Sequence, residues 1–492
     1  MSLQRQAYRS AGLSGISGIF ANGLEVLKYI VLARILDPSD FGLLAMAMVI
    51  ITIFRIFADG GTSNAVLHFR NQTDRQLSTL FWVNILAGSV LYILILIIAP
   101  FISGFYGEPE VARLLRIGGI MLPIHAAGSL YEVLLRKTLS FKQITISETV
   151  SGIMGFALAL VLALSGFGVY ALIWSYIATA SCMTVLYIIF GIRKWRPTFW
   201  FQPGEVRSHL AFGFYQMGER GLNIYATRID QLIIGRFFGP EILGAYHLAY
   251  QIILYPLLRL SPLLNRVALP VFSSRQFDDA ILRDGYIKLM RGLISLLAPL
   301  FLLAGLTAPW LVPFLFGRGW EFTIELIPLM VLIGLLRMLG NPSGNIILSK
   351  GKARLVFFWN LAVAVVNTTV FLIGALYSIF VLLGLYTVIN FVYYITGQWL
   401  MVNRLIFLTW RRFLRSTAPL LIILTLPLGV SWLFRIAMSP YQTAFGDFGM
   451  LFSISAVFLI CYLPLVWHTQ SDLIREFLQA LKSEETSAKN AR

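Results

Sequence analysis

Apolar residues fill most of the chain in a series of long stretches, and short polar connections separate one stretch from the next. An α-helix needs about 20 predominantly apolar residues to cross the hydrocarbon core of a bilayer, where it satisfies its own backbone hydrogen bonds. The pattern therefore predicts an all-α integral membrane protein with fourteen spans. The predicted spans are residues 11–34, 41–66, 77–103, 114–135, 144–166, 168–190, 209–235, 242–264, 287–313, 322–347, 355–377, 379–400, 416–436 and 448–468.

The composition excludes a large soluble domain. Hydrophobic residues make up 58% of the 492 residues, charged residues make up 13%, and the mean hydropathy is +0.77. No connection is long enough to hold an extracytoplasmic enzyme domain, and no Gly-rich phosphate-binding loop is present. The two cysteines, Cys182 and Cys461, lie far apart in apolar stretches, so we expect no disulfide, no metal site and no cofactor.

The distribution of positive charge predicts the topology. Most of the 39 Lys and Arg residues lie in the two tails or in the connections that follow even-numbered spans. Cytoplasmic loops of membrane proteins carry an excess of Lys and Arg, so we expect these connections and both termini in the cytoplasm. The net charge of +16 is dispersed over many short loops, which argues against nucleic acid as a partner.

A short motif recurs in the two halves of the chain. Three residues after the first predicted span return after the seventh with the same spacing: Arg34, Pro38 and Gly42 recur as Arg236, Pro240 and Gly244. A second echo joins residues 105–107 to residues 315–317. Two echoes in the same order indicate two six-helix repeats. Six is an even number, so the repeats are parallel and related by an axis along the membrane normal.

This repeat predicts the domain organisation. We expect an N-terminal lobe at residues 1–190, a cytoplasmic linker at 191–207 and a C-terminal lobe at 208–400. Residues 401–468 supply two additional helices, and residues 469–492 form a cytoplasmic tail.

Polar residues inside the predicted spans mark candidate functional positions. Ionised groups are costly in a bilayer, so they are expected to face a bundle interior or a water-filled cavity. In the seventh span the polar residues advance by three or four positions and share one helix face. They are Gln216, Arg220, Asn223, Thr227 and Asp230, with Glu219 at the border of the stripe. The first span carries Glu25 and Lys28, the second Arg55 and Asp59, the eighth Arg259 and the tenth Arg337.

Two interpretations of these charges stay open at this point. Together with Arg228, the cations outnumber the acids, and guanidinium groups suit a phosphate or pyrophosphate. Lys28, Arg55, Arg220, Arg259 and Arg337 are therefore the candidate substrate-binding residues. Glu25, Asp59, Glu219 and Asp230 are candidates for H⁺ or Na⁺ coupling. Alternatively, Glu25 with Lys28 and Arg55 with Asp59 form structural ion pairs within one helix.

Several segments resemble a known family. Residues 31–61, which read VLARILDPSDFGLLAMAMVIITIFRIFADGG, are similar to the start of the polysaccharide transporter family of the multidrug/oligosaccharidyl-lipid/polysaccharide flippase superfamily. Residues 77–84, 105–116, 134–142 and 166–174 continue the likeness. They resemble Wzx-type flippases, especially the branch that contains the colanic acid exporter WzxC.

This resemblance implies two six-helix lobes arranged as a V, with two added helices. It also implies the cargo, an undecaprenyl-pyrophosphate-linked oligosaccharide that is moved across the bacterial inner membrane by alternating access. Membrane lipid, a polysaccharide polymerase and a chain-length regulator are the partners that it suggests. Lys28, Arg55 and Arg220 are the candidates for contact with the pyrophosphate.

Two other classes of protein remain as alternatives. An ion-coupled drug antiporter of the multidrug-extrusion type shares the twelve-helix plan but more often has an acidic cavity. An O-antigen polymerase or ligase is an enzyme that needs a large extracytoplasmic loop, and the connections here are short. The sequence favours a flippase over both.

Overall fold

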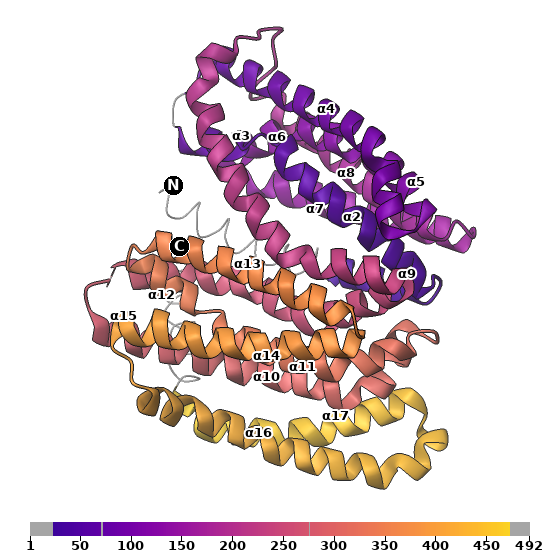
Figure 1. The fold of residues 1–492 in the computed structure, drawn as a ribbon, viewed down its shortest axis with the longest axis vertical. Coiled ribbons are helices and arrows are strands. Elements are labelled where there is room, and N and C mark those ends of the chain that lie inside the picture. The colour runs from indigo at the N-terminus through magenta and orange to yellow at the C-terminus, as the bar shows by residue number, and fades with distance from the viewer. Residues whose placement is uncertain (1–22, 70–71, 275, 473–492) are drawn as a thin grey trace, which may run out of the picture. The chain divides into compact units, whose positions relative to one another are not determined.

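A computed structural model describes residues 23–69, 72–274 and 276–472, and these residues are helical apart from short connections (Figure 1). Eleven of the described helices are long and apolar enough to cross a membrane, and each coincides with one predicted span. The all-α fold class is confirmed. Two other predicted spans, 209–235 and 242–264, fall in one further helix that is not among these eleven, and residues 11–22 of the first predicted span lie outside the described residues. The number fourteen therefore stays a prediction.

The chain divides into two compact units. Unit 1 comprises residues 1–247 and 364–368, and unit 2 comprises residues 248–363 and 369–492. The predicted lobes, linker and tail were drawn with other boundaries and stay a prediction.

Unit 1 contains a helix at residues 23–33 and most of the N-terminal half of the chain. Its further helices are α2 (Pro38–Ala58), α3 (Thr62–His68), α4 (Asp74–Tyr106), α5 (Pro109–Gly118), α6 (Met121–Lys137), α7 (Phe141–Leu164), α8 (Val169–Gly191), the 3₁₀ turn η1 (Pro203–Val206) and the first part of α9 (Arg207–Ser274). A hydrophobic core that includes Leu80, Tyr131 and Trp195 joins α4, α6 and the segment after α8.

Helix α9 begins in unit 1 and ends in unit 2. It is two helices joined at Gly239, whose φ of 79° and ψ of −179° break the helical path. Glycine adopts this conformation without steric cost, and Pro240 then starts the second helix. The break separates the predicted spans at 209–235 and 242–264.

Unit 2 contains the remaining helices, with α16 and α17 packed on α10. They are α10 (Asp279–Phe316), α11 (Glu321–Gly340), α12 (Ser343–Ser349), α13 (Ala353–Ala375), α14 (Ile379–Gly397), the π-helical turn η2 (Gln398–Asn403), α15 (Arg404–Ile406), α16 (Trp410–Met438), the 3₁₀ turn η3 (Ser439–Tyr441) and α17 (Gln442–Thr469). Five residues of α13, 364–368, are assigned to unit 1. Trp310, Met450 and Ile454 form the core of the α10–α17 contact.

The second sequence echo corresponds to two equivalent helix ends. Helix α4 ends at Gly107 and α10 ends at Gly317, and both glycines have a positive φ, 77° and 85°. Each is followed by a helix with an acidic residue in its first turn, Glu110 in α5 and Glu321 in α11. The same stop signal therefore closes the corresponding helix in both halves of the chain.

Small residues bring α7 and α8 close together. The buried positions of α7 repeat every four residues as Ser147, Ser151, Gly155, Ala159 and Ala163. A Cβ atom at Gly155 would lie 1.9 Å from Thr179 Oγ1 and 3.1 Å from the Ser175 carbonyl oxygen. This is the small-residue packing that membrane helices use for close approach.

Replacing Gly155 by Leu is therefore expected to destabilise unit 1. Overpacking of this kind typically costs about 1–3 kcal/mol. We expect a lower midpoint of thermal unfolding for purified Gly155→Leu protein in detergent. Gly104→Leu is the control, because an added Cβ at Gly104 meets no atom within 4 Å. Equal midpoints for the two variants would contradict the packing described for α7 and α8.

Candidate functional site

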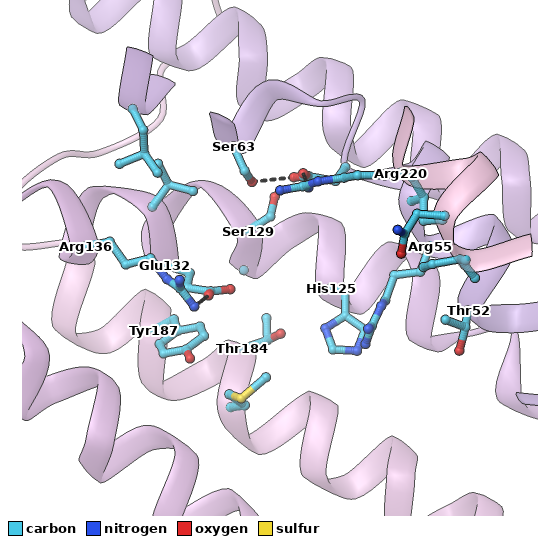
Figure 2. A pocket seen from close by; sticks show the side chains of 18 residues that line it. Thr52, Arg55, Ser63, His125, Ser129, Glu132, Arg136, Thr184, Tyr187 and Arg220 are labelled. Carbon is cyan, nitrogen blue, oxygen red and sulfur yellow. Dashed lines mark hydrogen bonds and ion pairs between the residues drawn. The ribbon is translucent and has the colours of Figure 1, made fainter. Parts of the chain in front are cut away.

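A cavity of about 740 Å³ lies within unit 1, and its polar lining is charged. Helices α2, α3, α6, α8 and α9 supply the lining residues. We call it the charged cavity (Figure 2). Its polar lining residues are Thr52, Arg55, Asp59, Ser63, His125, Ser129, Glu132, Arg136, Thr184, Tyr187, Arg220 and Asn223.

Helix α2 and helix α9 face each other across one side of this cavity. Asp59 is the C-cap residue of α2, where its backbone N–H donates to the Arg55 carbonyl oxygen. Its carboxylate accepts a hydrogen bond of 2.5 Å from Ser63 Oγ and lies 4.0 Å from an Arg220 guanidinium nitrogen. Arg220 and Asn223 are one turn apart on α9 and both line the cavity. The structure therefore brings four of the candidate residues, Arg55, Asp59, Arg220 and Asn223, together at one cavity.

Helix α6 contributes a second charged stripe. His125, Ser129, Glu132 and Arg136 advance by four, three and four positions, so they share one face, and all four line the cavity. Arg136 and Glu132 form an ion pair of 2.6 Å on the cavity wall, and Figure 2 shows it as a dashed line. The sequence reading missed these residues, although the spacing that identified α9 would also have identified α6.

Among the three arginines of the charged cavity, Arg55 is the one without an acidic contact partner. Within the part of the chain that the structure describes, no hydrogen bond or ion pair joins the Arg55 side chain to another residue. The acidic groups that act on it electrostatically are Glu132 and Asp59, which already contact Arg136 and Ser63. Figure 2 shows the Arg55 side chain extending toward His125 inside the cavity. The predicted Arg55–Asp59 ion pair is thus not formed at contact distance.

Lys28 is held at a different place in unit 1. Its Nζ donates a hydrogen bond of 2.5 Å to Ser175 Oγ and lies 4.4 Å from the ring centroid of Tyr176, both on α8. Lys28 is not among the residues that line the charged cavity. Glu25 lies one turn away and acts electrostatically on Lys28. This arrangement favours the structural interpretation of Glu25 and Lys28.

The rest of the α9 stripe turns away from the charged cavity. Asp230 is 5% exposed, and its carboxylate accepts a hydrogen bond of 2.7 Å from Tyr246. The Thr227 hydroxyl donates to the Asn223 carbonyl oxygen at 2.9 Å. Neither residue is among those that line the cavity. Gln216 and Glu219 were also predicted for the site, but their side chains are not among those that the structure describes.

The two remaining candidate cations belong to unit 2 and contact tyrosines. Arg337 donates a hydrogen bond of 2.5 Å to the Tyr386 hydroxyl and lies 5.6 Å from the centre of its ring. Arg259 donates to the Tyr255 hydroxyl and lies 4.5 Å from that ring centre. The role of these two arginines in binding stays a prediction.

The chemistry of the charged cavity suits an oxyanion. Arg55, Arg136 and Arg220 face two carboxylates, Asp59 and Glu132, so the lining carries one more guanidinium than carboxylate. A guanidinium offers several N–H donors in a planar fork that matches phosphate oxygens. Ser63, Ser129, Thr184 and Asn223 add neutral hydrogen-bonding groups that suit hydroxyl-rich ligands.

Comparisons with known proteins define the class of this protein. Residues 31–325 match the family described as polysaccharide biosynthesis protein. The match covers more than half of the chain, and the protein belongs to this family. It is a multi-pass membrane protein of the kind that the predicted spans indicated.

Individual relatives carry names from polysaccharide biosynthesis. The chain is 28% identical over 401 residues to the teichuronic acid biosynthesis protein TuaB of Bacillus subtilis, covering 81% of this chain and 83% of TuaB. It is 29% identical to the lipopolysaccharide biosynthesis protein WzxC of Escherichia coli, covering 73% of each chain. It is 33% identical to the amylovoran biosynthesis protein AmsL of Erwinia amylovora, covering 62% of this chain and 79% of AmsL.

Two solved structures share the fold. The lipid II flippase MurJ in an inward closed conformation has a TM-score of 0.70 and 15% identity, covering 94% of this chain and 99% of that chain. An inward-facing multidrug resistance transporter of the MATE family has a TM-score of 0.56 and 14% identity, covering 78% and 94%. These likenesses show that the chain shares its fold with both proteins.

The charged cavity is expected to contain water. In a variant without Cys182 and Cys461, a cysteine at Thr52 on the cavity wall should react with a small methanethiosulfonate reagent. A cysteine at Val90, which is 52% exposed on the apolar α4, should react at least about tenfold more slowly, because a thiol in hydrocarbon stays protonated. Equal reaction rates at both positions would contradict a hydrated cavity.

Proposed function

We propose that this protein is a flippase that moves undecaprenyl-pyrophosphate-linked oligosaccharide units across the bacterial inner membrane for the synthesis of a surface polysaccharide. The observation that carries this proposal is the arginine-rich charged cavity in a protein of the polysaccharide biosynthesis family. The names of TuaB, WzxC and AmsL and the lipid II flippase activity of MurJ support it. The protein is then a transporter and not an enzyme.

In the proposed mechanism Arg55 binds the pyrophosphate first, because it has no contact ion pair of its own in the described structure. Arg220 can exchange its 4.0 Å contact with Asp59 for a phosphate oxygen. The glycan then contacts the neutral hydroxyl and amide groups of the charged cavity, which belong to Ser63, Ser129, Thr184 and Asn223. The polyprenyl chain stays in lipid, where its transfer cost is lowest.

The direction of transport is the one that the resemblance to Wzx-type flippases implies, with cargo entering from the cytoplasmic leaflet and leaving at the opposite one. The excess of Lys and Arg predicts that both termini and the even-numbered connections lie on the cytoplasmic side, where the cargo enters. A polysaccharide polymerase and a chain-length regulator would receive the cargo there. Coupling to H⁺ or Na⁺ stays a hypothesis, with Asp230 as the buried carboxylate to test.

Arg55→Ala is expected to reduce export strongly without loss of the protein from the membrane. Loss of a hydrogen bond to a charged group costs about 1.5–3 kcal/mol, which corresponds to about a 10- to 150-fold loss of affinity. Arg220→Ala should have a similar effect, and Arg55→Lys should restore part of the activity because it keeps the charge. Surface polysaccharide and lipid-linked intermediate are measured in cells that lack the native protein.

The control for this experiment is Arg113→Ala. Arg113 is 63% exposed on α5, pairs with Glu110 at 2.7 Å and is not among the residues of the charged cavity. Normal export by both Arg55→Ala and Arg220→Ala would remove the pyrophosphate role from this cavity. Drug resistance that depends on Arg55, with unchanged polysaccharide export, would instead favour the extrusion antiporter.

A further inference from the structure

The two copies of the repeated Pro–Gly motif contact each other inside unit 1. A Cβ atom added to Gly42 would lie 1.8 Å from the carbonyl oxygen of Pro240, and a Cβ atom added to Gly244 would lie 1.8 Å from the carbonyl oxygen of Pro38. Both glycines are buried. We call these four residues the Pro–Gly seam.

The two contacts of the Pro–Gly seam are equivalent under the repeat. Pro38 corresponds to Pro240 and Gly42 corresponds to Gly244, so each repeat places its glycine on the proline carbonyl of the other. A two-fold contact has this reciprocal pattern, in which residue i touches j and the equivalent of j touches the equivalent of i. The neighbouring residues Phe41 and Leu243, which also correspond, are 2% and 0% exposed. The seam is thus a tightly packed, internally symmetric closure.

A second close approach lies at the other end of the same helix pair. A Cβ atom at Gly213 would lie 2.4 Å from the carbonyl oxygen of Gly60, and one at Gly61 would lie 2.3 Å from the carbonyl oxygen of Gly213. We call Gly60, Gly61 and Gly213 the Gly–Gly contact. Along α2 and α9, the cavity residues Arg55 and Arg220 lie between the seam and this contact. Backbone contacts therefore join α9 to α2 on one side of the charged cavity and to the turn after α2 on the other.

We propose, on the basis of the flippase function above, that the Pro–Gly seam is the outer gate of the transport path and that the Gly–Gly contact is its cytoplasmic counterpart. Either gate opens when α2 and α9 separate at that end. Only a residue without a Cβ allows the backbones to close, because the atoms opposite each glycine are backbone carbonyl groups that cannot rotate away. In the structure both gates are closed, because the backbones meet at the Pro–Gly seam and at the Gly–Gly contact.

The gate assignment predicts which side of the membrane reaches the cavity. The reporter is a cysteine at Thr52 in the protein without Cys182 and Cys461, labelled in intact cells by a membrane-impermeant thiol reagent. Gly42→Val and Gly244→Val should hold the seam open and raise the outside labelling rate about tenfold or more. The double variant should label no faster than either single variant, because both substitutions open the same seam.

Two matched variants complete the experiment. Gly213→Val should leave outside labelling low and raise labelling from the cytoplasmic side in inside-out vesicles. Gly218→Val, also on α9, should label like the parent from both sides, because no atom lies within 4 Å of a Cβ there. The outer-gate assignment would be overturned if Gly42→Val or Gly244→Val labelled from outside at the rate of the parent protein. It would also be overturned if the increases in labelling rate of the two single variants multiplied in the double variant.

A second test keeps all the glycines. Asp37 and Glu241 are exposed and adjoin the two prolines of the seam. A cleavable cross-linker between cysteines at these two positions should stop polysaccharide export, and cleavage should restore it. Full export by the cross-linked protein would overturn the gate. The labelling experiment needs no cargo, so it separates the gate from the proposed function. If the glycine variants label as expected but Arg55→Ala exports normally, the cargo assignment is refuted and the gate assignment is kept.

Discussion

The cost of placing ionised groups in a membrane governs the site described here. Five charged side chains, three arginines and two carboxylates, line one cavity inside a bundle of apolar helices. In hydrocarbon each would cost about 2.5–3.5 kcal/mol on insertion scales. Pairing lowers this cost for Glu132 with Arg136, and Ser63 hydrogen-bonds to Asp59. The Arg55 guanidinium is available to a ligand because the neighbouring carboxylates, Glu132 and Asp59, contact other residues.

The helices that carry the charges approach each other most closely through glycine. Backbone contacts at Gly42, Gly61, Gly213 and Gly244 join α2 and the turn after it to α9. At the Pro–Gly seam these backbone contacts are flanked by the buried side chains of Phe41 and Leu243, so the closed state is tightly packed.

The sequence predicted most of the helices and four of the twelve polar residues that line the charged cavity. Eleven predicted spans coincide with helices able to cross a membrane, because hydrophobic length alone determines them. Arg220 and Asn223 were identified by helical spacing, Arg55 and Asp59 were identified as charges inside an apolar span, and the four line the charged cavity together. The family motif over residues 31–61 contains Pro38 and Gly42 of the seam as well as Arg55 and Asp59 of the charged cavity.

The remaining part of the site depends on tertiary packing. Glu132 and Arg136 lie near the end of a span, where charges are expected at the membrane surface, and their place in the cavity depends on which face α6 turns inward. Lys28 was placed with Arg55 by helix position alone, but Ser175 and Tyr176 hold it elsewhere. Helical spacing shows which residues share one face of a helix, but it does not show which other helix that face contacts.

Direct binding of a diphosphate to the purified protein tests the central claim most simply. A short-chain prenyl diphosphate, the matching monophosphate and the matching alcohol are titrated calorimetrically into the detergent-solubilised protein at several salt concentrations. We predict saturable binding that is strongest for the diphosphate, weakens with salt and is lost in a protein with Ala at both Arg55 and Arg220. Equal binding of the diphosphate and the uncharged alcohol, or undiminished diphosphate binding by the double variant, would contradict the account.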